Sequence, residues 1–203
     1  LGTSLTGVGT DSNALKANEL QTLSSGWEEY LDVDGVDIRD LYFFHYDRKK
    51  LEKKETRGIW LQYFLKNWSE RNNAEFSKKY GFKSRPKNFD LLSIGTYMPF
   101  VQLDTDLTQV NQLLKYIKFG FGMCMDCACD DFREGRITRN EAILLVEKYD
   151  GKCSENYIKK FCDYIEISVD EFWRVVELFR GKMWIKNEKN EFYNSYWNSI
   201  KNN

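Results

Sequence analysis

Between Asp106 and Gly181 the sequence carries a series of helix-starting and helix-stopping signals, and this series limits the possible folds more than any other feature. Thr138-Arg-Asn-Glu141 and Ser168-Val-Asp-Glu171 match the capping box, in which a hydroxyl and a carboxylate satisfy free N–H groups at a helix start. Apolar residues follow at helical spacing, and glycines stand where the runs stop. We therefore expect packed antiparallel helices joined by short loops. The expected helices span residues 106–118, 138–150, 155–165 and 168–181.

The charge balance and the lack of long apolar runs narrow the class of protein. The 203 residues include 30 basic and 31 acidic side chains, so no overall field draws the chain to nucleic acid or to an anionic membrane. No window approaches the roughly 20 apolar residues that a membrane helix needs, and the N-terminus does not resemble a secretion signal. Five cysteines, an odd number, suit a reducing compartment. We expect a globular cytoplasmic protein with no nucleic-acid partner and no membrane insertion.

The N-terminal residues predict a strand, a tight turn and a helix. Leu1–Val8 is a short apolar and threonine-rich segment, and the residues after it offer several N-caps for a helix over Ala14–Leu23. In an α/β sheet, ligands bind beside the carboxyl ends of strands, where helix N-termini favour anions. Asp11 at this turn is therefore a candidate ligand-binding residue, while an ordinary β-to-α turn remains the structural alternative.

The region before the helical half predicts shorter elements. The acidic-then-basic segment 26–54 lacks the spacing of a calcium loop and indicates a solvated surface connection. Two aromatic-rich runs, Leu41–Tyr46 and Ile59–Leu65, are bounded by charge and predict short buried strands or other core segments. Ser69 can cap a helix over residues 69–80, which the glycine that follows would end.

Cys124, Cys127 and Cys129 have the side-chain type of metal ligands, but a structural zinc site needs a fourth ligand. His45 is the single histidine of the chain and lies far away in the sequence. A Cys–His nucleophile pair would need the same histidine. We therefore expect no metal here and interpret the cysteines as buried structural thiols.

Lys115 and Lys118 lie three residues apart at a helix end, where the helix dipole stabilises cations in any protein. The functional alternative is that both lysines, with Arg133, neutralise phosphate groups on a nucleotide-linked substrate. A similar choice applies to the aromatic residues between Trp60 and Trp68, which belong in a core by their usual burial unless one of them faces a sugar or base ring. Both choices stay open.

The central part of the chain, about Ile59–Arg180, resembles a known family. Each motif alone is weak, but their order and spacing are specific, and together they are similar to the C-terminal region of the N-acetyl sugar amidotransferases. The motifs are Trp60-Leu-Gln-Tyr-Phe-Leu-Lys-Asn-Trp68, Asn73, Lys79-Tyr-Gly-Phe-Lys83, Lys115-Tyr-Ile-Lys-Phe-Gly-Phe-Gly122, Asp126 to Arg133, Arg136-Ile-Thr-Arg-Asn-Glu-Ala142 and Lys148-Tyr-Asp-Gly151.

The resemblance implies an ATP-dependent enzyme of the PP-loop ATP-pyrophosphatase type, acting in surface-glycan biosynthesis such as lipopolysaccharide O-antigen, nonulosonic acid or flagellin-sugar formation. Such an enzyme converts a sugar acetamido group to an acetamidino group with ATP and Mg²⁺. Its ammonia comes from a partner glutaminase through an ammonia-channelling synthase-like subunit. Adenylation of the amide oxygen turns a poor leaving group into AMP, which ammonia displaces, while cations stabilise the phosphate charge.

The same resemblance implies a division of the chain. Residues 1–45 would end a nucleotide-binding α/β domain with a PP-loop sheet. Residues 46–185 would form a mainly α-helical substrate region. By its own composition, rich in Asn, Lys, Tyr and Trp, the polar and aromatic tail 186–203 is expected to dock loosely or to fray. The family's Ser-Gly-Gly-x-Asp-Ser loop does not occur in these 203 residues, and Gly7-Val-Gly-Thr-Asp-Ser12 is a partial echo. We therefore expect the C-terminal portion of a longer protein, inactive by itself.

The predicted site residues follow from matching the family's motifs to this sequence. They are Gly9, Thr10 and Asp11 for the nucleotide, Lys115, Lys118 and Asp126 for catalysis, and Trp68, Asn73 and Arg133 for the substrate.

Two other functions remain open. A PP-loop enzyme that modifies tRNA would share the turn at Asp11 and would bind RNA in a steeply salt-dependent way. A non-catalytic helical binding module would use the lysines and the helix caps for structure alone.

Overall fold

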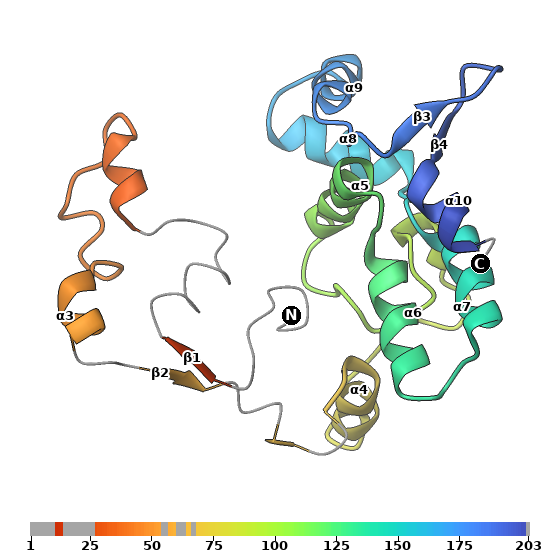
Figure 1. Ribbon diagram of the computed structural model, residues 1–203, viewed down its shortest axis with the longest axis horizontal. Helices are drawn as coiled ribbons and strands as arrows, with labels where there is room; N and C mark the ends of the chain where they lie inside the picture. The colour runs from red at the N-terminus through yellow and green to blue at the C-terminus, as the bar shows by residue number, and fades with distance from the viewer. Residues whose placement is uncertain (1–10, 14–26, 54–56, 60–63, 66–67, 202–203) are drawn as a thin grey trace. The chain divides into compact units, whose positions relative to one another are not determined.

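The computed structural model describes residues 11–13, 27–53, 57–59, 64–65 and 68–201, and the chain divides into two compact units (Figure 1). The first unit is Leu1–Trp68 and the second is Ser69–Asn203. We describe each unit by itself.

The first unit contains a small antiparallel sheet. Strand β1, Asp11–Asn13, pairs with β2, Arg57–Ile59, so that Asp11 lies opposite Ile59. The sequence predicted a turn and a helix start at these residues, and this local prediction is wrong because the backbone pairs with a distant strand instead. The predicted strand at Leu1–Val8 and helix at Ala14–Leu23 lie outside the described residues.

The remaining described elements of the first unit are short helices and turns. They are the 3₁₀ helix η1, Trp27–Asp32, and the helix α3, Arg48–Lys53. The predicted buried strand at residues 41–46 is wrong. Leu41 alone is buried, and its carbonyl accepts hydrogen bonds from the backbone N–H groups of Phe44 and His45, which bends the chain into turns. Phe64 and Leu65 are exposed rather than buried.

The second unit is mostly helical, as the sequence predicted. Its elements are α4 (Glu70–Lys78), the 3₁₀ helix η3 (Leu91–Ile94), α5 (Leu107–Phe119), α6 (Met123–Arg133), α7 (Arg139–Tyr149), α8 (Glu155–Tyr164), α9 (Val169–Leu178), β3 (Trp184–Lys186), β4 (Phe192–Asn194) and α10 (Ser195–Lys201). Strands β3 and β4 pair as an antiparallel hairpin. Among the described residues the sheets are two-stranded and antiparallel, so the nucleotide-binding α/β sheet stays a prediction.

The predicted helix caps are confirmed at Ser69 and Thr138, and the predicted capping box at Ser168 forms only in part, because the Glu171 side chain pairs with Arg174 instead. The Ser69 side chain accepts a hydrogen bond from the Asn72 N–H at 3.3 Å, and Ser168 does the same for Glu171 at 3.1 Å. Thr138 forms the complete capping box with Glu141 at the start of α7. Each cap satisfies N–H groups that the helix itself leaves without partners.

The largest core lies where α5, α8 and α9 pack together at one end of the unit (Figure 1). Helical spacing places its members on the inner faces of these helices, and burying each aliphatic or aromatic side chain contributes roughly 1.5–3 kcal/mol. The buried members are Val110, Leu113, Ile117, Ile158, Cys162, Phe172 and Val176. Phe179 is exposed just beyond the end of α9.

Helix α6 forms two further cores. Cys127 packs with Ala74 of α4, and Cys124 packs with Val146 of α7. Residues 123–133 are not among the helices expected from the sequence. In the structure, α6 packs against both α4 and α7 and so connects them.

The C-terminal residues, for which we expected loose docking or fraying, fold as the β3–β4 hairpin and helix α10 within the described residues. The backbone N–H of Ser195 donates to the Met183 carbonyl at 2.9 Å, and Trp197 packs against the core that contains Cys124. The hairpin and α10 therefore belong to the folded unit. Within the described ranges, no helix is both long and apolar enough to cross a membrane.

Candidate functional site

The connection between α5 and α6 is built from two glycines. Gly120 ends α5 in the left-handed conformation, with φ of 83°, which glycine adopts without strain. Gly122 stands at the N-cap of α6, and a Cβ added there would lie 2.8 Å from an oxygen of the Asp150 side chain. The Gly120-Phe-Gly122 motif therefore allows a sharp turn and the close approach of a carboxylate.

Asp150 caps α6 from the end of another helix. Its Oδ2 accepts from the Gly122 N–H at 2.9 Å, and its Oδ1 accepts from the Cys124 and Met125 N–H groups at 3.1 and 3.3 Å. These N–H groups would otherwise lack partners at the helix start. Burial raises the pKa of Asp150 to about 6, although the three hydrogen bonds favour the charged form. One buried carboxylate thus joins α6 and α7.

Gly151 completes this junction. Its φ is +72°, and a Cβ there would lie 2.2 Å from the ring of Tyr116 on α5. The Tyr116 ring also packs on Trp184 of β3, with ring centres 5.0 Å apart. The glycine motif after α5 and the Asp-Gly motif after α7 are therefore parts of one contact, although the sequence separates them by 28 residues.

Two of the predicted catalytic residues meet at the same junction. Lys115 of α5 forms an ion pair with Asp126 in the first turn of α6, and both side chains are largely buried, with exposures of 21% and 31%. The Lys115 ammonium also lies over the Phe121 ring, 4.7 Å from its centre. Asp126 therefore neutralises Lys115, and the pair links the two helices.

The other predicted cations lie on outer faces. Lys118 is exposed and lies 5.3 Å from the centre of the Phe119 ring. Among the residues that the structure describes, no carboxylate forms an ion pair with Lys118, which leaves its charge available. Arg133 pairs with Asp130 one turn earlier on the exposed face of α6.

The remaining predicted residues are not brought to this junction by any described contact. Asn73 is half-buried on α4, in the same unit. Trp68 is exposed at the end of the first unit, and Asp11 lies in β1 of that unit. Gly9 and Thr10 lie outside the described residues.

A pocket of about 300 Å³ opens beside the Asp150 cap. Pockets of this size accommodate small ligands. Its lining comes from α5, α6, α7 and the C-terminal hairpin and helix: Tyr116, Gly120, Met125, Val146, Glu147, Asp150, Lys152, Asn194 and Trp197. None of these residues is among the site residues predicted from the sequence. Asp150-Gly151 was interpreted only as a helix stop, because nothing in the local sequence shows which distant N–H groups the carboxylate meets.

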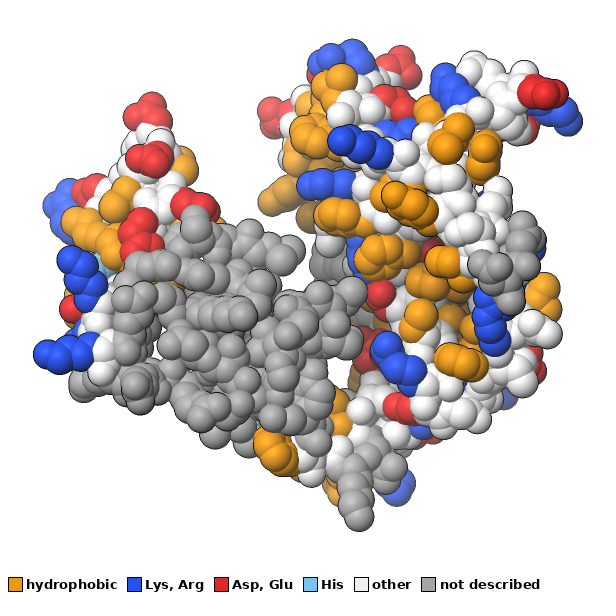
Figure 2. All heavy atoms as spheres, viewed as in Figure 1, with side chains coloured by type: hydrophobic (Ala, Val, Ile, Leu, Met, Phe, Trp, Pro, Cys, Tyr) orange, Lys and Arg blue, Asp and Glu red, His pale blue; other side chains and the backbone are white. Residues whose placement is uncertain are grey.

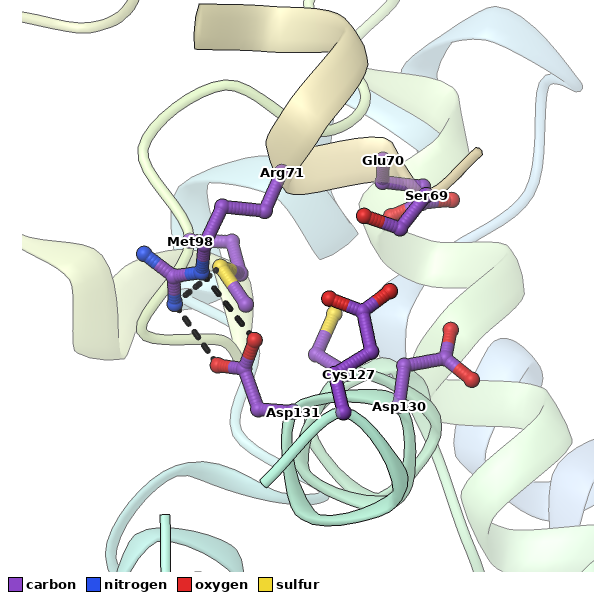
Figure 3. Close-up of a pocket in the computed structure, with 8 residues that line it drawn as sticks. Ser69, Glu70, Arg71, Met98, Cys127, Asp130 and Asp131 are labelled. Atoms are coloured by element: carbon purple, nitrogen blue, oxygen red, sulfur yellow. Dashed lines mark hydrogen bonds and ion pairs between the residues drawn. The ribbon is translucent and has the colours of Figure 1, made fainter. Parts of the chain in front are cut away.

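A second, much smaller hollow lies between α4 and α6 (Figure 3). Arg71 and Asp131 point toward each other across it, joined at 3.0 and 2.7 Å, and the Tyr97 hydroxyl donates to the same carboxylate at 2.8 Å. Burial raises the pKa of Asp131, but the hydrogen bonds from Arg71 and Tyr97 outweigh it, so the pKa lies below its ordinary value. At about 10 Å³ the hollow holds one water at most, so we interpret it as a structural link.

The cysteines divide into buried and exposed thiols. Cys124 and Cys127 are buried, as predicted, and burial raises the pKa of both thiols. Cys129 is exposed, which corrects the prediction for this residue. His45 lies in the first unit, where its ring packs edge-on against Trp27 at 4.5 Å.

Comparison with known proteins identifies the second unit. A comparison with curated protein sequences gave no match. The family described as "LPS biosynthesis protein WbpG-like, C-terminal domain" matches residues 76–202, which is more than half of the chain and nearly all of the unit that begins at Ser69. The chain therefore belongs to the WbpG-like family of lipopolysaccharide biosynthesis proteins, of which it carries the C-terminal domain, and its role lies in glycan biosynthesis.

Proposed function

We propose that this chain is the substrate-side region of an ATP-dependent amidotransferase that converts a sugar acetamido group to an acetamidino group. The family supports a sugar-biosynthetic role. The observation that carries the proposal is the α5–α6 junction, where Lys115 and Asp126 are paired while the charge of Lys118 stays available. Such an arrangement suits a reaction that handles phosphate groups.

The reaction needs two steps. The amide oxygen attacks the α-phosphorus of ATP, a new P–O bond forms, and pyrophosphate leaves. Ammonia then attacks the carbon, AMP departs with the former amide oxygen, and the nitrogen loses a proton. In this proposal Lys118 stabilises the negative charge that develops on the phosphate, Lys115 holds the junction, and the Asp126 carboxylate accepts the proton.

The other predicted roles remain part of the proposal. Trp68, Asn73 and Arg133 would contact the substrate, and Gly9, Thr10 and Asp11 the nucleotide. A glutaminase and an ammonia-channelling subunit would supply ammonia, in the cytoplasm. Mg²⁺ would accompany ATP, but the described residues contain no cluster of three side chains suited to a metal ion, so we assign no ligands to it.

The test measures AMP formation by the complete protein encoded by the reading frame that contains this chain. An N-acetylated nucleotide sugar, ATP, Mg²⁺ and an ammonium salt serve as substrates. Lys118→Met should lower the turnover number about 100-fold, the usual cost of losing a charge-stabilising group. Lys159→Met removes an exposed lysine of α8 and should leave turnover unchanged. AMP formation that does not depend on the sugar would contradict the proposal.

One observation favours a second candidate, the non-catalytic helical module. The Asp150 cap and the packing of Gly151 on Tyr116 explain two of the sequence motifs by structure alone. Unchanged turnover in Lys118→Met would support this candidate.

No observation favours the tRNA-modifying alternative. Basic and acidic side chains are interspersed over the described part of the face shown in Figure 2. RNA binding that weakens steeply with salt would still establish it.

A further inference from the structure

We propose that the pocket beside Asp150 binds the neutral ring of a sugar, with Tyr116 and Trp197 as its apolar walls. The inference deepens the proposed function and rests on it for the identity of the sugar. The sugar ring itself is then assigned to the pocket. Trp68, Asn73 and Arg133 would contact other parts of the substrate.

Two aromatic side chains in the lining are fixed before any ligand arrives. The Tyr116 ring is held between Gly151 and Trp184. Trp197 packs against the core that contains Cys124, and its backbone N–H donates to the Asn194 side chain at 3.1 Å in the first turn of α10. The C–H face of a pyranose ring is apolar and packs well on aromatic rings. Side chains that are already ordered lose little entropy on binding, which favours affinity.

The polar side-chain groups of the pocket that have no partner within the described residues are mainly hydrogen-bond donors. The Asp150 carboxylate is occupied by three backbone N–H groups, and the Asn194 oxygen by two. In contrast, the side chains of Tyr116, Trp197 and Lys152 form no hydrogen bond or ion pair within the described part of the chain. Burial and the nearby Asp150 raise the pKa of Tyr116 to about 12, so its hydroxyl keeps its proton. Sugar hydroxyl and acetamido oxygens can accept from these groups.

The charges and the size of the pocket favour a neutral ligand. Glu147 and Asp150 line it beside Lys152, and Lys201 pairs with Glu147, so the lining has no excess of positive charge that would attract a nucleotide phosphate. Met125 and Val146 provide a small apolar area that suits the methyl of an acetamido group. The volume of about 300 Å³ is at the lower end for ligand pockets, which suits one ring rather than a dinucleotide or an oligosaccharide.

The first experiment measures binding to the 203-residue chain without ATP. N-acetylglucosamine and N-acetylmannosamine are titrated while protein-to-ligand saturation transfer is recorded by NMR, with inorganic pyrophosphate as the charged comparison. We expect saturable binding of at least one sugar and none of pyrophosphate. Binding of pyrophosphate at the pocket, or no saturable binding of either sugar, would overturn the proposal.

Variants locate the bound sugar. Trp197→Ala removes a wall and should weaken binding about ten-fold or more, whereas Tyr196→Ala, at the exposed neighbouring position of α10, should not change it. Tyr116→Phe keeps the ring and removes only the hydroxyl, so it tests the pocket without disturbing the fold, and it should weaken binding several-fold. Unchanged binding in both pocket variants would refute this site.

The complete protein separates this inference from the proposed function. If it forms AMP with a sugar KM that neither pocket variant alters, the reaction stands and the pocket assignment fails. If the sugar binds at the pocket but no AMP forms, the pocket stands and the proposed reaction fails.

Discussion

Asp150 shows how one side chain gives this fold a pH dependence. In the folded chain the pKa of the Asp150 carboxyl is raised to about 6 by burial, compared with its ordinary value of 3.8. Between these values the folded state binds more protons than the unfolded state, so the contribution of Asp150 to the free energy of unfolding falls as the pH rises. Above about pH 6 it is constant.

The change Asp150→Asn tests this prediction. It removes the ionisation but leaves a poorer cap, because its NH₂ group faces the Gly122 N–H. We expect it to destabilise the chain more at pH 4 than at pH 7, by roughly 2–3 kcal/mol. Urea unfolding followed by circular dichroism across this range measures the difference. A loss of stability that does not depend on pH would show that burial does not shift the pKa of the Asp150 carboxyl.

Gly151 supports a second prediction at the residue scale, with Gly135 as its control. Both glycines have positive φ, +72° and +71°, but only at Gly151 would a Cβ meet another residue, the Tyr116 ring. Gly135→Ala should lower the free energy of unfolding by about 1 kcal/mol, because alanine is strained in this backbone conformation. Gly151→Ala should lower it by about 2 kcal/mol more, because the Tyr116 ring must also move. Equal losses of unfolding free energy in the two variants would disprove the close contact.

At the scale of elements, α7 depends on its capping box. Thr138 satisfies the N–H of Glu141, and the Glu141 side chain accepts from the Thr138 N–H. We expect Thr138→Ala to lower the free energy of unfolding by about 1 kcal/mol, the usual loss for an N-cap. Asn140→Ala, in the exposed first turn of the same helix, should have little effect. Because Asp150 follows directly on α7 as its C-cap, the Thr138 variant should also loosen α6, which hydrogen exchange of the Cys124 and Met125 amides would detect.

At the scale of the whole second unit, the Arg71–Asp131 pair links α4 to α6 across 60 residues of sequence. Arg71→Met leaves the buried Asp131 carboxylate with the Tyr97 hydroxyl and a 3.7 Å ion pair to Arg136, and Asp131→Asn leaves Arg71 without its carboxylate. Each change should therefore lower the free energy of unfolding by about 2 kcal/mol. The double variant should lose clearly less unfolding free energy than the sum of the two single variants, because both single changes remove the same interaction. The exposed Arg174–Glu171 pair of α9 is the control, for which we expect no measurable coupling. Additive losses at Arg71 and Asp131 would show that they act independently.

The sequence by itself determined the helices from α5 to α9 other than α6, and the caps at Ser69, Thr138 and Ser168. These signals are local, since a cap or an apolar stripe depends on residues within one or two turns. Only the tertiary structure decided that Asp150 caps α6, that Arg71 meets Asp131, that β1 pairs with β2, and that the C-terminal residues close a pocket with Tyr116. Each of these contacts joins residues far apart in the chain, and the packing of the whole unit, rather than the neighbouring sequence, determines which partners meet.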